Sequence, residues 1–190
     1  MQWIKFIQGE LLGDMGIEIT SSHSARIVYS SKFKEYLIWL STTLTSFGIK
    51  QSGNIRKYFV NNVFAYHYKS KSYPELLTIK KIWYPNGKKV VPYNLKLTPV
   101  TVRQWYIGDG CLEKNRNSRP RIKLATQSFS ELENMYLKKI LSELGFKITY
   151  SPANNCLFVS PYSVDNFLAY IGDCPIECYK YKWGIKSCNG

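Results

Sequence analysis

Two aspartates stand in the same sequence context, 109 − 14 = 95 residues apart. Asp14 ends the phrase Gly-Glu-Leu-Leu-Gly-Asp, and Asp109 ends Gln-Trp-Tyr-Ile-Gly-Asp. Each phrase is a helix-like apolar stretch, followed by a short β-like run that carries Glu18 or Glu113. Carboxylates that hold divalent ions can supply the nucleophilic water and the charge neutralisation that phosphodiester hydrolysis requires. A pair delivered from equivalent places suggests one site built twice about an approximate two-fold axis, the symmetry of duplex DNA.

A glycine precedes each aspartate. Because Gly13 and Gly108 have no side chains, they predict that the two helices approach backbone to backbone and bring the aspartates close to the pseudo-dyad. The alternative is that Gly-Asp is only a helix-stop turn with the aspartate as a local cap. That reading is sufficient for one copy, but two matched copies in a basic chain favour a functional site.

The charge balance points to a polyanionic partner. The chain has 26 Lys and Arg against 13 Asp and Glu, a net charge of +13, which favours nucleic acid or an anionic membrane. No apolar run approaches the roughly 20 residues of a membrane span, and the N-terminus lacks a signal-peptide pattern. We therefore expect no membrane partner, and a location in the cytoplasm or an organelle matrix. The five irregularly spaced cysteines predict reduced thiols and no structural zinc.

The same order of elements is predicted twice. The first half predicts helices over 3–12, 34–46 and from Pro74 onward, with strands over 16–20, 25–31, 55–59 and 63–68. The second half predicts helices over 98–109, 130–144 and from Pro161 onward, with strands over 110–114, 120–127, 146–150 and 156–160.

Three landmarks support a duplication. The offset between halves is 95 from Asp14 to Asp109, 96 from Phe33 to Phe129 and 97 from Gly48 to Gly145, a drift that single-residue loop insertions explain. The predicted fold class is α+β, with two pseudo-symmetric αββαββα half-domains. Their bounds are 1–84 and 98–190, joined by a linker region over 85–97.

Alternating side chains mark candidate DNA-binding strands. Arg121 and Lys123 alternate with apolar neighbours, which places basic groups on one face of a strand. Glu18 and Glu113 could accept hydrogen bonds from cytosine amino groups, and solvated strand ends are an equal alternative. The full set of predicted DNA-binding residues is Glu18, Arg26, His67, Lys69, Glu113, Arg119, Arg121 and Lys123.

The paired phrases resemble the motifs of the LAGLIDADG homing endonuclease family in its single-chain, two-motif form. The segments 83–89, 105–110 and 125–130 are also similar to intron-encoded members. The resemblance implies two β-sheets that form a saddle over DNA, with the motif helices packed at the pseudo-two-fold axis. It also implies a monomer that cleaves double-stranded DNA with Mg²⁺ or another divalent cation such as Mn²⁺.

The resemblance also assigns residues to the reaction. Asp14 and Asp109 match the metal ligands, with the carbonyls of Gly13 and Gly108 as extra ligands. Lys32 and Gln127, at the ends of the second strands, match positions that send polar groups toward the scissile phosphates. Two departures from the motif pattern are Met15, after the first aspartate, and Gln104, where the first motif has Gly9.

These observations predict a site-specific DNA endonuclease of the intron-homing type. One alternative is an RNA maturase that binds intron RNA, and another is a DNA-binding regulator without catalysis. Two acids facing phosphates speak against a pure binder, and only weakly against a maturase.

Overall fold

The computed structural model describes residues 2–60, 63–114 and 119–184, and its chain forms two compact units. One unit comprises residues 14–88, and the other comprises the residues up to Gly13 together with those from Lys89 onward. None of the helices in the described part of the chain is long and apolar enough to cross a membrane.

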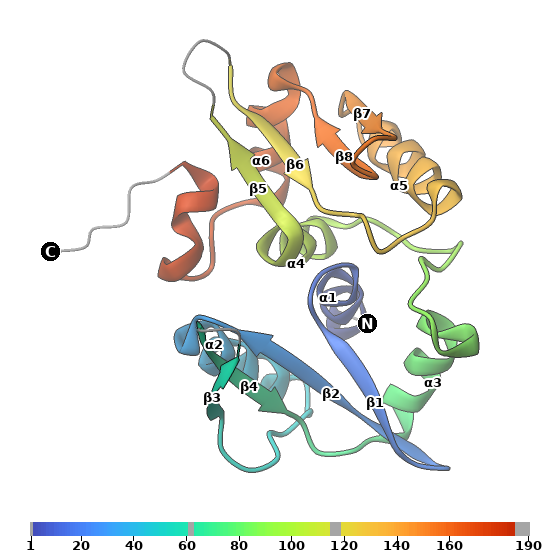
Figure 1. The fold of residues 1–190 in the computed structure, drawn as a ribbon, viewed down its shortest axis with the longest axis vertical. Coiled ribbons are helices and arrows are strands. Elements are labelled where there is room, and N and C mark those ends of the chain that lie inside the picture. Colours follow the sequence, from blue (N-terminus) through green and yellow to red (C-terminus); the bar gives the residue numbers. More distant parts are fainter. Residues whose placement is uncertain (1, 61–62, 115–118, 185–190) are drawn as a thin grey trace, which may run out of the picture. The chain divides into compact units, whose positions relative to one another are not determined.

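The unit of residues 14–88 is a four-stranded antiparallel sheet with two covering helices. The strand order is β1-β2-β4-β3, and α2 and α3 pack against the strands (Figure 1). Ile27, Tyr29 and Tyr68 project from the sheet into this unit's core. The elements are β1 (Gly16–Ser21), β2 (Ser24–Ser31), α2 (Lys34–Ser46), β3 (Arg56–Val60), β4 (Val63–Lys69), α3 (Pro74–Trp83) and the 3₁₀ turn η1 (Pro85–Gly87).

The other unit repeats this sheet and contains both motif helices. Its strand order is β5-β6-β8-β7, which is the order of the first sheet when each strand is matched to its counterpart (Figure 1). The elements are α1 (Gln2–Leu12), α4 (Pro99–Asp109), β5 (Gly110–Glu113), β6 (Arg121–Leu124), α5 (Glu131–Glu143), β7 (Ile148–Ser151), β8 (Cys156–Val159), η2 (Pro161–Ser163), α6 (Val164–Ile171) and η3 (Glu177–Trp183). The predicted αββαββα duplication is confirmed.

Matching helix ends explain why the repeat is so regular. Gly48 and Gly145 follow α2 and α5 with φ of 88° and 90°, the left-handed conformation that a glycine adopts without a Cβ clash. The backbone N–H of Ile49 then donates to the carbonyl of Leu44, which closes the helix and starts the next extended segment. At the other end of a helix, Thr98 caps α4 by accepting from the N–H of Thr101.

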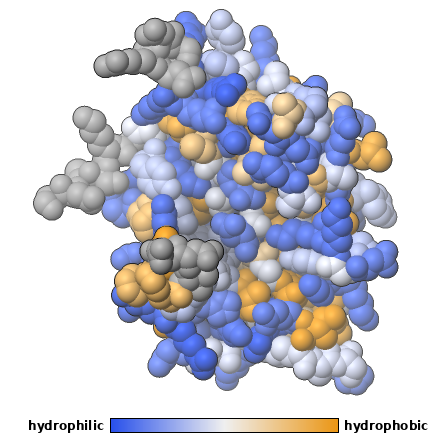
Figure 2. All heavy atoms as spheres, in the orientation of Figure 1, coloured by the Kyte–Doolittle hydropathy of each residue, from blue (hydrophilic) through white to orange (hydrophobic). Residues whose placement is uncertain are grey.

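The strand predicted over 146–150 begins only at Ile148, and two other predicted boundaries are wrong for local reasons. β6 ends at Leu124 rather than 127, because a turn follows in which the Thr126 carbonyl accepts from the Phe129 N–H and from the buried Asn134 side chain. The last helix begins at Val164, because residues 161–163 form a 3₁₀ turn first. Hydrophilic side chains cover much of the face shown in Figure 2, in keeping with the high charge of the chain.

Candidate active site and nucleic-acid-binding faces

The motif helices α1 and α4 pack backbone to backbone at their glycines. A Cβ added to Gly9 would collide with the carbonyl oxygen of Thr101, and a Cβ on Gly13 would lie 3.3 Å from the Cα of Gly108. The Thr101 hydroxyl also donates to the carbonyl of Lys5 at 3.1 Å, which joins the two helices directly. The expected close approach at Gly13 and Gly108 is therefore present.

The contact at Gly9 explains one departure from the motif. Gln104 is the counterpart of Gly9, and its Cβ would lie 2.8 Å from a Cβ added there. The two residues thus face each other across the helix pair, and a small residue on one side leaves room for the larger one on the other. Gln104 is completely buried in this contact.

The second departure, Met15 in place of a glycine after the first aspartate, also has a packing reason. Gly110 follows Asp109, and a Cβ there would collide with the ring of Tyr106. At the counterpart of Tyr106 the first half has the smaller Leu11, and at the counterpart of Gly110 it has Met15, whose side chain is buried. The ring of Tyr106, which the first half lacks, is what excludes a side chain from position 110.

Both motif aspartates stand at the C-terminal ends of the motif helices. Asp14 lies in the turn after α1 and is exposed, while Asp109 is the last residue of α4 and is half-buried. The last carbonyls of a helix carry the negative end of its dipole. A carboxylate next to such an end adds negative charge, so each place attracts a cation.

Each helix end accepts hydrogen bonds from a lysine that the sequence did not single out. Lys89 Nζ donates to the carbonyl of Gly13 at 2.9 Å. Lys182 Nζ donates to the carbonyls of Ile107 at 2.5 Å and Gly108 at 3.1 Å. Both lysines therefore place an ammonium group beside the backbone of a motif aspartate.

The segment around Lys182 both donates hydrogen bonds to α4 and accepts one from it. The Tyr106 hydroxyl donates to the carbonyl of Lys182, and the Lys182 side chain is only 7% exposed. Burial raises the pKa of the Tyr106 hydroxyl, so it stays a donor at neutral pH. A sequence signal did exist: each lysine follows the last helix of its half, at a spacing of 182 − 89 = 93 that is close to the repeat offset.

Lys32 and Gln127 occupy equivalent positions, since 127 − 32 = 95. Lys32 directly follows β2, is exposed and lies over the ring of Phe33 at 4.9 Å. Gln127 is exposed in the turn after β6, where its carbonyl accepts from the Asn155 side chain at 3.1 Å. Both side chains are available to a ligand, and their part in the reaction stays a prediction.

In the first sheet the predicted DNA-binding residues lie opposite the core face. Arg26 donates through Nη2 and Nε to Glu18 Oε2, at 2.7 and 3.0 Å. This hydrogen bond lowers the pKa of the Glu18 carboxyl. Burial, with Lys69 as the next cause, lowers the pKa of His67, whose Nδ1 lies 3.0 Å from the Ser30 hydroxyl. His67 is consequently neutral at pH 7, while Lys69 is a half-buried strand residue.

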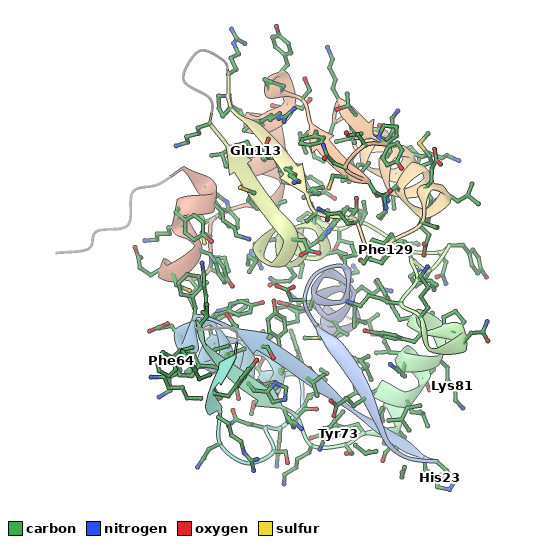
Figure 3. The ribbon with its side chains drawn as sticks, in the orientation of Figure 1. His23, Phe64, Tyr73, Lys81, Glu113 and Phe129 are labelled. Atoms are coloured by element: carbon green, nitrogen blue, oxygen red, sulfur yellow. The ribbon has the colours of Figure 1, made fainter. Side chains whose placement is uncertain are left out.

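The second sheet repeats the acid–base pair. Arg121 Nε donates to Glu113 Oε2 at 2.8 Å, and the guanidinium lies over the ring of Phe158 at 4.2 Å. Glu113 projects from β5 (Figure 3). Lys123 follows on the same face of β6, and Arg119 lies beyond the strand, 5.2 Å from the centre of the Tyr162 ring.

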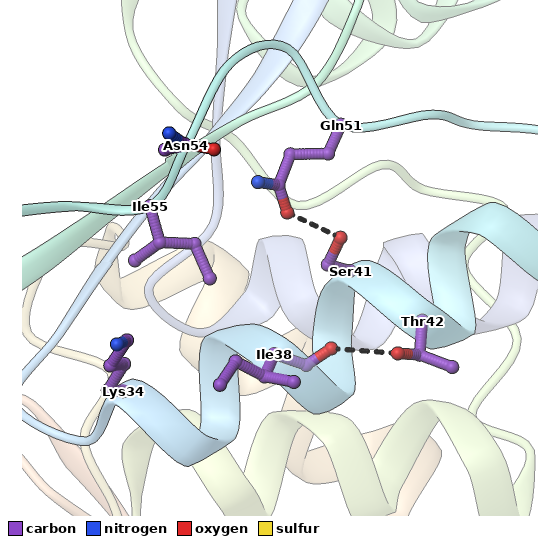
Figure 4. A pocket seen from close by; sticks show the side chains of 7 residues that line it. All are labelled: Lys34, Ile38, Ser41, Thr42, Gln51, Asn54 and Ile55. Carbon is purple, nitrogen blue, oxygen red and sulfur yellow. Dashed lines mark hydrogen bonds between the residues drawn. The ribbon is translucent and has the colours of Figure 1, made fainter.

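A hollow of about 340 Å³ lies between α2 and the residues that precede β3. Figure 4 shows the Ser41 hydroxyl, which donates to Gln51 Oε1, on one wall. Among the described residues that line it none is acidic, and the only charged one is Lys34. The hollow therefore does not supply the chemistry of the motif aspartates.

Solved structures share the fold of this chain. The fold is that of the homing endonuclease I-WcaI bound to its DNA recognition sequence, with a TM-score of 0.77 and 16% identity over 94% of this chain and 84% of that one. I-DmoI in complex with DNA and Mn matches with a TM-score of 0.52 and 13% identity, over 91% of this chain and 99% of that one. The fold is thus a homing-endonuclease fold.

The family follows from the sequence. The model of the LAGLIDADG DNA endonuclease family matches residues 4–159, and the chain belongs to this family. It is 29% identical over 151 residues to the uncharacterised protein MJ1098 of Methanocaldococcus jannaschii, and 25% identical over 163 residues to the cytochrome b mRNA maturase bI2 of Debaryomyces hansenii. These matches cover 76% and 77% of this chain, and the chain spans only 58% and 56% of the two relatives' lengths.

Proposed function

We propose that this chain is a site-specific DNA endonuclease that cuts both strands of a long asymmetric target, in the manner of intron homing. One observation carries the proposal. An aspartate stands at the C-terminal end of each motif helix, and a lysine ammonium donates to the carbonyl of the glycine that precedes it. A carboxylate and an ammonium group are thus placed together twice, at equivalent points of a chain with a net charge of +13.

The donor atoms fit a hard divalent cation such as Mg²⁺ or Mn²⁺. Asp14 and Asp109 offer carboxylates, and Gly13 and Gly108 offer carbonyl oxygens, each with a second lone pair besides the one that accepts from lysine. Within the described residues no group of three or more His, Cys, Asp or Glu side chains gathers in one place. Phosphate oxygens and water would complete the coordination of a bound Mg²⁺, as is usual for this ion. When bound, the cation supplies an activated water and neutralises phosphate charge.

The lysines have a separate task in this proposal. Nζ of Lys89 and of Lys182 is held at a helix end, so each ammonium places a fixed positive charge beside a phosphate as negative charge develops there. Fixed electrostatic groups of this kind contribute about 10²- to 10³-fold to a rate. Because the lysines are already held by backbone carbonyls, they need little reorganisation when the substrate binds.

The partner in this proposal is double-stranded DNA bound by one copy of the chain. The two halves differ at matched positions, such as Lys32 against Gln127 and Val28 against Lys123. A monomer with two unlike halves has no need of a palindromic site. The fold similarity to I-WcaI bound to its DNA recognition sequence and to I-DmoI in complex with DNA supports this partner.

A second candidate function is that of an RNA maturase. The similarity to the maturase bI2 is the observation that favours it. Competition binding separates the two functions: an endonuclease prefers one duplex DNA sequence over structured intron RNA, and a maturase shows the reverse preference.

The experiment that tests the proposal uses a plasmid library with randomised inserts, incubated with the full chain and Mg²⁺. Linearised plasmids should share one long sequence. Asp14→Asn and Asp109→Asn should abolish double-strand cutting of that sequence and keep its binding in a gel shift, because a metal ligand is lost and no phosphate contact is removed. Asp165→Asn, at an exposed position of α6, is the matched control and should cut normally. Double-strand cutting by both motif variants at the wild-type rate would refute the proposed site.

A further inference from the structure

The same glutamate–arginine pair occurs at the same register of both sheets. Glu18 lies directly opposite Arg26 in the β1–β2 ladder, and Glu113 lies directly opposite Arg121 in the β5–β6 ladder. Each glutamate follows its motif aspartate by four residues (18 − 14 and 113 − 109), and each arginine follows it by twelve (26 − 14 and 121 − 109). The two halves thus present an identical charged pair at equal distances along the chain from their catalytic acids.

Stability alone is a weak reason for these pairs. Their side chains are between 29% and 46% exposed, and ion pairs so placed contribute little to folding because solvent screens them. Both pairs lie on the sheet face opposite the core residues Ile27 and Ile122. A β-ribbon that faces a major groove reads base edges from such a face.

The pairs hold each arginine in a defined orientation. Glu18 binds the Nε edge of the Arg26 guanidinium, and Glu113 binds the Nε edge of Arg121. Within the described part of the chain neither arginine has a further hydrogen-bond acceptor, so the outer edge with Nη1 keeps its donors. That edge matches the two acceptors of guanine, O6 and N7. An arginine already fixed by a carboxylate loses less side-chain entropy when it binds a base.

We propose that Arg26 and Arg121 each read one guanine in the major groove, with Glu18 and Glu113 as positioning residues. Since the register is the same in both sheets, the two half-sites carry the same G·C base pair at the same distance from the cut. This inference rests on the proposed DNA-cutting function and adds a specific element of its target.

The next position on each strand predicts where the half-sites differ. Two residues beyond the arginine, β2 has Val28 and β6 has Lys123. Valine offers only apolar contact, which suits a thymine methyl group, whereas lysine suits guanine or a phosphate. The two half-sites should therefore match at the arginine position and diverge at its neighbour.

Binding selection from a randomised duplex library, in EDTA so that no cutting occurs, tests the proposal with the full chain. Wild-type protein should select a sequence with two symmetrically placed G·C pairs, measured from the cut mapped separately in Mg²⁺. Arg26→Ala should lower the preference for guanine about 10- to 100-fold in one half-site only, and Arg121→Ala should do so in the other. Glu143→Ala, which removes the exposed Lys139–Glu143 pair on α5, is the matched control and should change no position.

A charge swap separates positioning from structure. The double variant Glu18→Arg with Arg26→Glu keeps an ion pair between β1 and β2, so its melting temperature should match that of the wild type. If the pair is only structural, the selected sequence stays the same, and the proposal is wrong. If Arg26 reads the base, the preferred base at that one position changes.

Other outcomes are equally decisive. A uniform loss of affinity for all sequences in Arg26→Ala would make Arg26 a phosphate contact and overturn the inference. A wild-type site that is cut in Mg²⁺ but lacks the matched G·C pairs overturns the inference and leaves the proposed endonuclease standing. A chain that selects and cuts no DNA at all overturns both.

Discussion

Replacing Lys182 by methionine should weaken both folding and cutting. The side chain is 7% exposed, and Nζ donates to the carbonyls of Ile107 and Gly108. Hydrogen bonds from a charged donor are worth about 1.5–3 kcal/mol, and a cation at a helix C-terminus adds about 0.3–1 kcal/mol. Removing the ammonium also removes its desolvation cost, which offsets part of this loss. We expect the free energy of unfolding to fall by about 2 kcal/mol.

Two other lysine variants give reference values for the loss of stability in Lys182→Met. Lys89→Met removes one bond, to the carbonyl of Gly13, from a half-buried position, so about 0.5–1.5 kcal/mol should be lost. Lys180→Met, in the same turn as Lys182, removes a partly exposed ion pair with Glu177 and should cost at most about 1 kcal/mol. Urea unfolding gives the three values.

Cutting distinguishes a catalytic ammonium from a structural one. With a duplex labelled on both strands, Lys89→Met and Lys182→Met should each lower double-strand cutting about 10²- to 10³-fold at a temperature where both variants are folded. Lys180→Met should cut normally. If Lys182→Met is folded and cuts as fast as Lys180→Met, the ammonium only caps α4, and its assigned role in the reaction is refuted.

Two further perturbations test the helix contact and the sheet face. Gly9→Ala should destabilise the fold by about 2–3 kcal/mol, because its Cβ meets the Thr101 carbonyl. Gly13→Ala should cost about 1 kcal/mol or less, because its Cβ meets the Gly108 Cα at 3.3 Å. Equal losses of stability for the two variants in urea unfolding would contradict this geometry. The pKa of His67 is lowered from its ordinary value of 6.5 mainly by burial, so the native state binds fewer protons there than the unfolded state. The contribution of neutral His67 to stability should be complete above pH 6.5 and be lost as the pH falls from 6.5 through the lowered pKa. His67→Gln should flatten the pH dependence of unfolding in that window, and an unchanged slope would show that His67 does not titrate as inferred.

Local signals were enough to predict the repeated fold. Gly48 and Gly145 end equivalent helices because each adopts a left-handed conformation, and that requirement is visible in the sequence as Phe-Gly-Ile and Leu-Gly-Phe. The offset of 95 to 97 residues between the halves then matched each strand of the first half to its counterpart in the second. Boundaries failed where a side chain farther along the chain took part, as in the turn after β6 whose Thr126 carbonyl accepts from Asn134.

The lysines at the site could not be predicted in the same way. Lys89 contacts Gly13 across 76 residues, and Lys182 contacts Gly108 across 74. In the sequence Lys89 stands in a polar turn and Lys182 in a short segment with other lysines, and in either setting a lysine is ordinarily solvated. Only the packing of each turn against a helix end turns these residues from surface charges into fixed donors.

The repeat in the sequence and the compact units of the structure divide the chain at different places. By sequence, α1 begins the first half, yet it packs with α4 in the unit that contains the second sheet. The reason is physical: Phe6, Ile7 and Leu11 are buried, and the glycines of α1 fit only against a backbone as close as that of α4. A fragment that starts at residue 98 would leave one face of α4 without this partner. The contact between the motif helices therefore holds the start of the chain in the unit of the second sheet, and a change at this contact should affect stability and cutting together.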